Sequence, residues 1–345
     1  MSHSILVPLT GLFLLLSTAL NATGQELNLY IWSEYIPDEV VNDFTKTTGI
    51  KVRISTYDSN EAMYAKIKLV GASYDLIVPS TYFVGLMRSQ GMLQKIDKKK
   101  LTNFALLDKK FVGLPFDPDN DYSIPYMWGS TSLIVNTRAL KGVSVTSYAD
   151  LWKPELKGRL ILPNDLREVL GIGLKVMGFS INETDPAHLE KAYEKLTHLM
   201  PQVRVFDADS PKQALLSGEV AAGVVWNGEA YIANGEDPDI VYIYPPEGYS
   251  LWMDSFCIPR DATNVEAAYL FLNYMLRPEI SAWISKETGY SSPNAGAREQ
   301  LEDELKNNPI IYPGDKDVER GEFLGYLDDA TRKLYEKYWV KLKSR

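Results

Sequence analysis

Hydrophobic and polar positions follow two different periods along the chain, and the N-terminal part alternates between predicted strands and predicted helices. Apolar or alternating runs at 27–32, 51–57 and 74–78 are typical of strands. Between them, apolar residues recur at helical spacing within 40–44 and 63–69. This order predicts a parallel sheet covered by helices, an architecture that binds ligands beyond the carboxyl ends of its strands.

The same order returns later in the chain. Residues 158–162 and 220–226 are predicted strands, and residues 167–177 and 187–199 are predicted helices. We therefore expect an α/β fold with two lobes, each a mostly parallel sheet covered by helices, and a ligand in the cleft between the lobes.

A stretch rich in proline and aromatic residues, 116–126, separates the two units. We expect it to be a surface loop that leads into a crossing strand near 128–130. Because the sequence has no linker rich in glycine and serine, short crossing segments should join the lobes. Such lobes close around a ligand by a hinge motion.

The extreme N-terminus predicts export. Residues 5–20 are almost wholly apolar, and small residues follow them up to Gly24, so residues 1–24 are expected to be a signal peptide. Cleavage after Ala22 would suit the sequence nearly as well as cleavage after Gly24. A membrane-anchoring helix is less favoured, because the run is shorter than the roughly 18–20 residues that a membrane span needs. The segment before the run has no Lys or Arg, unlike an ordinary signal peptide.

Composition limits the class of partner. The 345 residues are 45% hydrophobic and 23% charged, which suits a folded protein of about two domains. Thirty-six basic and 45 acidic residues give a net charge of −9. This balance disfavours nucleic acid, which binds to clustered Lys and Arg.

Cysteine and histidine are too few for a disulfide framework or a zinc site. Cys257 is the one cysteine in the sequence, and the three histidines are His3, His188 and His198. We expect Cys257 to be a small buried hydrophobic residue, not a nucleophile. No metal and no cofactor is predicted.

Aromatic and acidic residues follow the predicted strands at several places. Trp32, Glu34 and Tyr35 come directly after the first strand, and the other such positions are Ser80, Tyr82, Asp165, Glu168, Trp226, Trp252 and Asp254. Carboxylates neutralise ammonium groups, and flat rings attract cations while they pack against methylene groups. If the strand ends converge on one cleft, this set of side chains predicts a site for a small organic cation, such as a polyamine.

Each of these residues also has an ordinary structural interpretation. Asp165 and Glu168 could form a helix-capping box, and the tryptophans could simply be packing residues. Asp254 could be a turn residue. The repetition of the pattern at several strand ends favours the binding site.

The chain resembles the periplasmic spermidine/putrescine-binding proteins, the solute receptors of polyamine ABC transporters. The resemblance runs from about Leu27 nearly to the C-terminus and is carried by many motifs in the same order. They are WSEY, YDSNEAMYAKIK, YDLIVPSTYFV, MLQKIDKKKLTNF, PFDPDNDYSIPYMWG, ADLWKPELKG, NDLREV, VVWNG, WMDS and GYSSPNA.

The resemblance implies a role for each site residue. An aromatic box would surround the ligand, made of Trp32, Tyr35, Tyr82, Trp226, Trp252 and Tyr290. The carboxylates that would hold the ammonium groups are Glu34, Asp165, Glu168 and Asp254, and Ser80 would add a hydrogen bond. No catalytic residue is implied.

The resemblance also implies discontinuous lobes and a transport partner. The N-terminal lobe would comprise residues 25–129 and 254–298, and the C-terminal lobe residues 130–253 and 299–345. The mature protein would be a periplasmic monomer that delivers spermidine or putrescine to an inner-membrane ABC permease.

One position departs from the family pattern. Family members that recognise spermidine have a glutamine where this sequence has Leu324. One end of the ligand would then lose a polar partner, so the sequence leaves open which polyamine is preferred.

The same residues argue against some other functions and leave one open. A glycosidase is disfavoured, because Asp165 and Glu168 lie on one helical turn and cannot flank a scissile bond from opposite sides. Neither His188 nor His198 lies beside a strand-end nucleophile, so no Ser-His-Asp triad is supported. A sugar receptor would favour neutral polar groups over carboxylates. A receptor for another organic cation, such as thiamine, remains an alternative.

Overall fold

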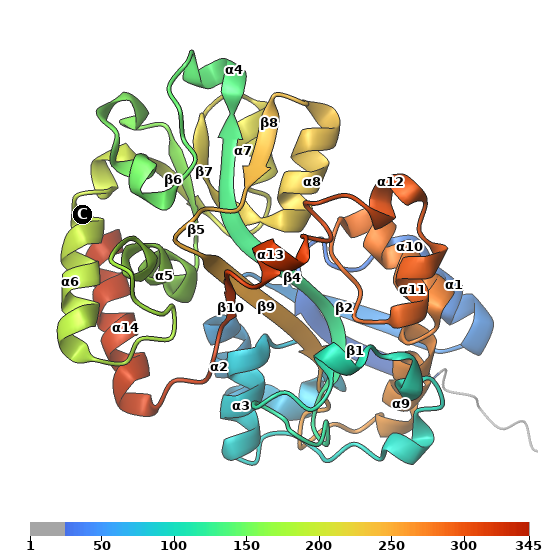
Figure 1. Cartoon of the computed structure of the whole chain (residues 1–345). Coiled ribbons are helices and arrows are strands. Elements are labelled where there is room, and N and C mark those ends of the chain that lie inside the picture. Colours follow the sequence, from blue (N-terminus) through green and yellow to red (C-terminus); the bar gives the residue numbers. More distant parts are fainter. Residues whose placement is uncertain (1–24, 345) are drawn as a thin grey trace, which may run out of the picture.

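Two β-sheets organise the chain, and helices cover them (Figure 1). The computed structural model describes residues 25–344, so the predicted signal peptide lies outside the described residues. The first sheet is fully parallel, with the order β2-β1-β3. Its strands are β1 (Glu26–Trp32), β2 (Lys51–Tyr57) and β3 (Leu76–Ile77).

The second sheet has seven strands in the order β10-β9-β4-β7-β5-β6, with β8 also paired to β4. They are β4 (Ile124–Asn136), β5 (Leu160–Pro163), β6 (Val203–Asp207), β7 (Ala222–Trp226), β8 (Ile240–Ile243), β9 (Tyr249–Phe256) and β10 (Gly321–Phe323). The two-lobed α/β class predicted from the sequence is confirmed.

The second sheet is less parallel than we expected. The strands β5, β6 and β7 are parallel to one another, and β10 is parallel to β9. However, β4 is antiparallel to β7, β8 and β9. The physical reason is that the chain passes from one lobe to the other along β4 and returns along β9, so these two strands must run in opposite directions.

The strands β4 and β9 connect the lobes. They pair from Ile124 with Phe256 to Thr131 with Ser250, and they cross the centre of the molecule in Figure 1. Beyond this pairing, bridges from Ile77 to Cys257 and from Ser80 to Asp254 attach β9 to the first sheet. The crossing strand predicted near 128–130 is confirmed.

Helices cover both sheets on their outer faces. Around the first sheet lie α1 (Asp38–Thr48), α2 (Asn60–Val70), α3 (Thr81–Ser89), α9 (Val265–Met275) and α10 (Pro278–Thr288) (Figure 1). Around the second sheet lie α4 (Thr137–Leu140), α5 (Leu166–Val176), α6 (Pro186–Thr197), α7 (Lys212–Leu216), α8 (Asn227–Glu236) and α14 (Asp329–Lys343). Between α10 and β10 the chain forms α11 (Ala295–Gln300), α12 (Asp303–Lys306) and α13 (Asp315–Val318).

The helix α1 shows how local sequence sets the boundaries of an element. Pro37 is its N-cap residue, and Gly49 ends it with a φ of 75°, a left-handed conformation that glycine adopts without steric cost. Val40, Val41 and Phe44 are buried, as their spacing predicts.

The stretch 116–126 is not the simple surface loop that we expected. Asp117 is buried, and its carboxylate accepts hydrogen bonds from the backbone of Tyr122 and the hydroxyl of Ser123. The strand β4 already begins at Ile124. A buried carboxylate needs such donors. The polar side chains of Asp117 and Ser123 therefore hold the loop together from inside and are not exposed.

The hydrophobic core is divided in the same way as the sheets. One cluster lies mostly in the predicted N-terminal lobe and includes Leu29, Phe44 and Phe271, and another lies mostly in the predicted C-terminal lobe and includes Leu162 and Leu170. This division agrees with the predicted discontinuous lobes, whose exact boundaries stay a prediction. Within residues 25–344, no helix has both the length and the apolar character that a membrane span requires.

Cys257 lies at the end of β9 and is fully buried. Burial raises the pKa of its thiol well above the usual range, because a thiolate would lose its hydration. The expectation of a small buried hydrophobic residue is confirmed.

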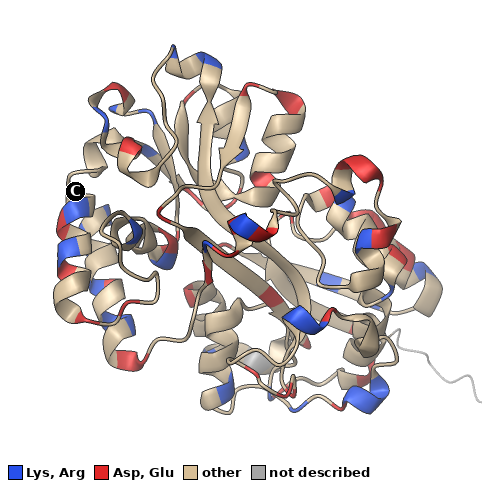
Figure 2. Cartoon of the chain, viewed as in Figure 1, with Lys and Arg blue, Asp and Glu red and all other residues tan. Residues whose placement is uncertain are grey.

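Lys and Arg residues are distributed over the outer helices and loops of both lobes (Figure 2). Asp and Glu residues lie among them on the same elements. The whole chain has a net charge of −9.

We predict that Gly129→Ala destabilises the protein. Gly129 lies opposite Trp252 in the β4–β9 pair, and a Cβ atom at this position would come within 2.6 Å of the indole ring and also meet the Asn227 side chain. Overpacking of this kind costs about 1–3 kcal/mol. Urea denaturation measures the loss, with Gly235→Ala as the control, because a Cβ at Gly235 in α8 would meet no atom within 4 Å. Equal free energies of unfolding for the wild type and Gly129→Ala would contradict the prediction.

Candidate functional site

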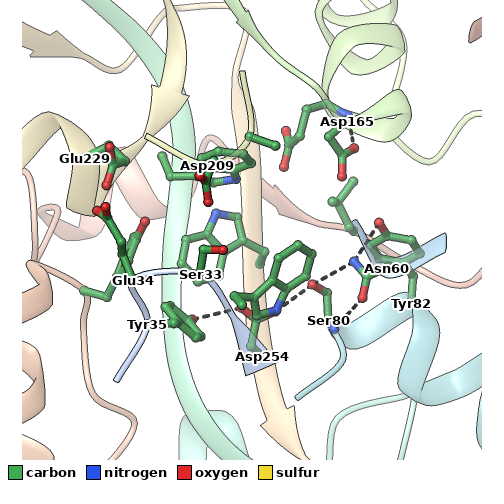
Figure 3. A pocket seen from close by; sticks show the side chains of 17 residues that line it. Ser33, Glu34, Tyr35, Asn60, Ser80, Tyr82, Asp165, Asp209, Glu229 and Asp254 are labelled. Atoms are coloured by element: carbon green, nitrogen blue, oxygen red, sulfur yellow. Dashed lines mark hydrogen bonds between the residues drawn. The ribbon is translucent and has the colours of Figure 1, made fainter. Parts of the chain in front are cut away.

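A cleft of about 680 Å³, including its open part, lies between the lobes at the β4–β9 crossing. Figure 3 shows side chains from both lobes converging on it. All eleven predicted ligand-binding residues line this cleft: Trp32, Glu34, Tyr35, Ser80, Tyr82, Asp165, Glu168, Trp226, Trp252, Asp254 and Tyr290. The structure adds Ser33, Asn60, Ala208, Asp209, Glu229 and Leu324 to the lining.

The strand β9 provides the floor of the cleft through its period-two alternation. Trp252 and Asp254 line the cleft, and Ser250 on the same face donates a hydrogen bond of 3.0 Å to Glu168 Oε1. Because a strand rises about 3.3 Å per residue, Ser250 and Asp254 are separated by roughly 13 Å. One strand face therefore places an indole ring between two carboxylate positions.

Asp254 is a buried carboxylate without a cationic partner among the described residues. Ser80 Oγ donates to its Oδ1 at 2.6 Å, and the Tyr35 hydroxyl donates to its Oδ2 at 2.8 Å. The side chain is almost completely buried, and this desolvation raises the pKa of Asp254 to about 7 in spite of the two hydrogen bonds. A cation in the cleft would stabilise the ionised form.

Asn60, the first residue of α2, holds the network around Asp254. Its Nδ2 donates to Ser80 Oγ at 3.1 Å and to the Tyr82 hydroxyl at 3.0 Å, and its Oδ1 accepts from the Ser80 backbone at 3.1 Å. Burial raises the pKa of the Tyr35 and Tyr82 hydroxyls well above the usual range, so both remain protonated donors. Asn60 was not predicted to be a site residue from the sequence.

Asp165 and Glu168 had two interpretations, a helix-capping box and part of a binding site, and the structure contains elements of both. Asp165 is the N-cap of α5, and its Oδ1 accepts from the backbone of Arg167 at 2.8 Å and of Glu168 at 3.0 Å. Glu168 does not complete a capping box, because its Oε1 accepts from the hydroxyls of Thr131 and Ser250. Both carboxylates remain exposed to the cleft.

Burial raises the pKa of both carboxyls, and repulsion by Asp165 contributes to the rise at Glu168, whose pKa is about 8. Glu168 is therefore mostly protonated at neutral pH when no cation lies beside it. The neighbouring Arg167 does not form a salt bridge with them. Its guanidinium lies 5.1 Å from the centre of the Tyr82 ring and donates to the carbonyl of Gly325 and the side chain of Asn182.

The aromatic residues line the cleft and also pack against one another. The Tyr290 ring makes edge contacts with Tyr35 and Trp252, with centroids 5.3 Å apart in each pair. Trp32 is fixed by a hydrogen bond from its Nε1 to the Val78 carbonyl at 3.0 Å. Because the rings hold one another in place, their faces are preorganised for a ligand.

Glu34 lies at the opposite side of the cleft from Asp165 (Figure 3). Its carboxylate accepts a hydrogen bond of 2.7 Å from Lys212, which also binds Glu229. Asp209 and Glu229 were not predicted from the sequence, although both follow strands as the predicted site residues do. Asp209 follows β6, which was not recognised as a strand, and Glu229 lies in the first turn of α8 after β7.

The arrangement is suited to a flexible organic cation. Six carboxylates line the cleft together with six aromatic rings. Within residues 25–344, no group of three or more His, Cys, Asp and Glu residues is arranged to hold a metal ion. Ammonium groups joined by methylene segments match this alternation of charge and ring.

Comparison with known sequences identifies relatives along the whole chain. Residues 39–313 match the family described as bacterial extracellular solute-binding protein. The spermidine/putrescine-binding periplasmic protein of Salmonella typhimurium is 46% identical, over 95% of this chain and 94% of the relative. The protein of the same name from Escherichia coli is 47% identical, over 92% of this chain and 91% of the relative.

Solved structures agree in fold. The spermidine/putrescine ABC transporter substrate-binding protein PotD from Streptococcus pneumoniae superposes with a TM-score of 0.79 at 36% identity, covering 93% of this chain and 99% of that chain. The TpPotD lipoprotein of Treponema pallidum has a TM-score of 0.82 at 27% identity, covering 93% of this chain and 100% of that chain.

We predict that Asp254→Asn stabilises the ligand-free protein at neutral pH. The raised pKa means that the folded state binds a proton that the unfolded state releases above pH 4, so the wild type loses stability as the pH rises from about 4 to 7. An asparagine does not titrate. The advantage of the variant should therefore grow over this range to at most about 4 kcal/mol.

Urea denaturation of ligand-free protein between pH 4 and 8 measures this difference. Asp150→Asn is the control with the opposite sign. Hydrogen bonds from Lys153, Thr146 and Ser147 lower the pKa of Asp150 to about 2, so this variant should be less stable at neutral pH. If the difference in free energy of unfolding between Asp254→Asn and the wild type does not change with pH, the pKa of Asp254 is not raised by burial.

Proposed function

This chain is a member of the bacterial extracellular solute-binding family and belongs to its spermidine/putrescine-binding proteins, and we propose that it captures a polyamine in the interlobe cleft. The relatives named for spermidine and putrescine match almost the whole chain. A further relative, the putrescine-binding periplasmic protein PotF of Escherichia coli, is 32% identical over 94% of this chain.

The observation that carries the proposal is the set of buried carboxylates without a protein cation. Asp165, Glu168 and Asp254 line the cleft, and their hydrogen bonds come from hydroxyls and backbone amides. Buried charges of this kind need a counter-charge. Polyamine nitrogens have a basicity close to that of lysine and are protonated at neutral pH, so they supply that charge.

Each side chain has a distinct role in this mechanism. Asp254 binds one ammonium near the middle of the cleft, and Asp165 with Glu168 binds another at one end. The rings of Trp32, Trp252 and the other aromatic residues pack against the methylene groups between them. Because the cleft is built from both lobes, a bound ligand stabilises the closed arrangement.

The closed receptor then delivers the polyamine to an ABC permease. The protein acts outside the cytoplasm as a monomer, after removal of the predicted signal peptide, and it binds its ligand reversibly without catalysis. The family membership and the names of the relatives support this role.

Isothermal titration calorimetry tests the proposed function directly. Spermidine and putrescine should bind, while maltose and thiamine should not. If the protein binds maltose or thiamine but neither spermidine nor putrescine, the proposal is wrong.

We predict that Asp254→Asn weakens polyamine binding by at least about 100-fold. Loss of one partner of a buried ion pair costs about 3–5 kcal/mol, because the remaining charge is buried alone. Titration calorimetry with putrescine and spermidine measures the change. Asp75→Asn is a matched control, because Asp75 is equally buried but binds Asn28 and Asn264 away from the cleft. Unchanged affinity in Asp254→Asn would remove Asp254 from the binding site.

We also predict that polyamine affinity increases from pH 6 to pH 8. The bound state requires ionised carboxylates, whereas Asp254 and Glu168 have a pKa of about 7 and about 8 in the empty cleft. Binding therefore releases protons, and each group contributes up to about a tenfold gain per pH unit below its pKa.

Calorimetry in buffers of different ionisation enthalpy measures the proton release. In Asp254→Asn the pH dependence should be weaker, since one titrating group is gone. An affinity that is constant or falls between pH 6 and pH 8 would contradict this linkage.

A further inference from the structure

A lysine ammonium is held by the same kind of carboxylate group that would hold a ligand. Lys212, the first residue of α7, is almost completely buried. Its Nζ donates to Glu34 Oε2 at 2.7 Å, to Ser210 Oγ at 2.9 Å and to both carboxylate oxygens of Glu229 at 3.1 Å. All three hydrogens of the ammonium are therefore satisfied by the protein.

This ion pair joins the two predicted lobes. Glu34 follows β1 of the first sheet, whereas Lys212 and Glu229 belong to helices of the second lobe. Glu34 also has a φ of 50°, a left-handed conformation that residues with a side chain rarely adopt. Local strain of this kind persists where surrounding contacts hold the residue in place, and Lys212 provides such a contact.

The pair changes the charge that one end of the cleft presents. Glu34 and Glu229 line the cleft, but Lys212 does not, so its ammonium offsets one of the two carboxylate charges without filling the cavity. In the part of the chain that the structure describes, no salt bridge involves Asp165, Glu168, Asp209 or Asp254. The protein itself thus supplies a cation at one end of the cleft and leaves the middle and the other end without one.

The geometry of Figure 3 gives this asymmetry a consequence for the ligand. Glu34 and Glu229 lie at one side, Asp165 lies at the other, and Asp254 lies between them in the view. A diamine can bind at Asp254 and at Asp165 with Glu168, and it leaves the Glu34 end free. A triamine that extends to Glu34 places its third ammonium beside the Lys212 ammonium, where like charges repel.

On the basis of the proposed function, we propose that Lys212 is a specificity-determining residue that lowers the affinity for a triamine relative to a diamine. It does so by acting as the counter-ion of Glu34 and Glu229. The cleft therefore discriminates between a diamine and a triamine by the number of carboxylates that have no lysine counter-ion.

The test compares putrescine and spermidine binding to the wild type and to Lys212→Met, which keeps an apolar stem and removes the ammonium. In the variant, spermidine affinity should rise by about tenfold or more, while putrescine affinity should change by less than about threefold. Lys175→Met is the matched control. Lys175 forms a comparably buried ion pair, with Glu322, but does not line the cleft. Both affinities should be unchanged in this control.

A second variant keeps the test decisive if Lys212→Met does not fold. In Lys212→Met/Glu229→Gln the buried side chain at position 229 carries no charge, and Glu34, which is 59% exposed, remains charged. A selective gain for spermidine in the same direction but of smaller size is expected, because Glu34 no longer shares its charge with a lysine. If both affinities move together, or if spermidine affinity falls, Lys212 positions Glu34 and does not set specificity.

The outcomes also separate this inference from the proposed function. A wild type that binds neither polyamine contradicts the polyamine receptor itself. A wild type that binds both, with the same affinity ratio in the Lys212 variants, contradicts only the role of Lys212.

Discussion

The character of the cleft depends on one physical constraint: it contains carboxylates that are shielded from water and have no protein cation beside them. Asp254 is surrounded by neutral donors, and burial raises the pKa of its carboxyl because these donors compensate the charge only in part. Hydroxyl groups stabilise such a carboxylate only in part. In the proposed function a ligand ammonium supplies the missing counter-charge, so affinity for cations would follow from a feature that is unfavourable in the protein alone. At the Glu34 end of the cleft, the protein itself supplies a positive charge, because the Lys212 ammonium forms an ion pair with Glu34.

The backbone makes this arrangement possible through the pairing of two long strands. The alternation of β9 directs Trp252 and Asp254 into the cleft, and Gly129 on β4 leaves room for the indole ring. The same two strands connect the lobes. The binding site is consequently part of the element that joins the two halves of the protein, so ligand contacts and lobe arrangement are physically coupled.

Much of this could be predicted from the sequence, because hydrophobic periodicity and strand-end residues are local signals. The strands and helices of the first sheet, the cleft and eleven of the seventeen residues that line it were predicted in this way or through the family resemblance. Parallel and antiparallel pairing of β4 could not be predicted, since it depends on how the chain crosses between lobes. The burial of Asn60 depends on hydrogen bonds to residues 20 and 22 positions away, and the attachment of Lys212 to Glu34 joins residues 178 positions apart.

The position of the single cysteine has a practical consequence. Cys257 is sealed inside the first lobe, and its thiol resists ionisation, so thiol-directed dyes have no ready target on the native fold. A cysteine introduced at the rim of the cleft would therefore carry a fluorophore at one defined place. The unaltered scaffold is thus already suited to conversion into an optical reporter of its own ligand.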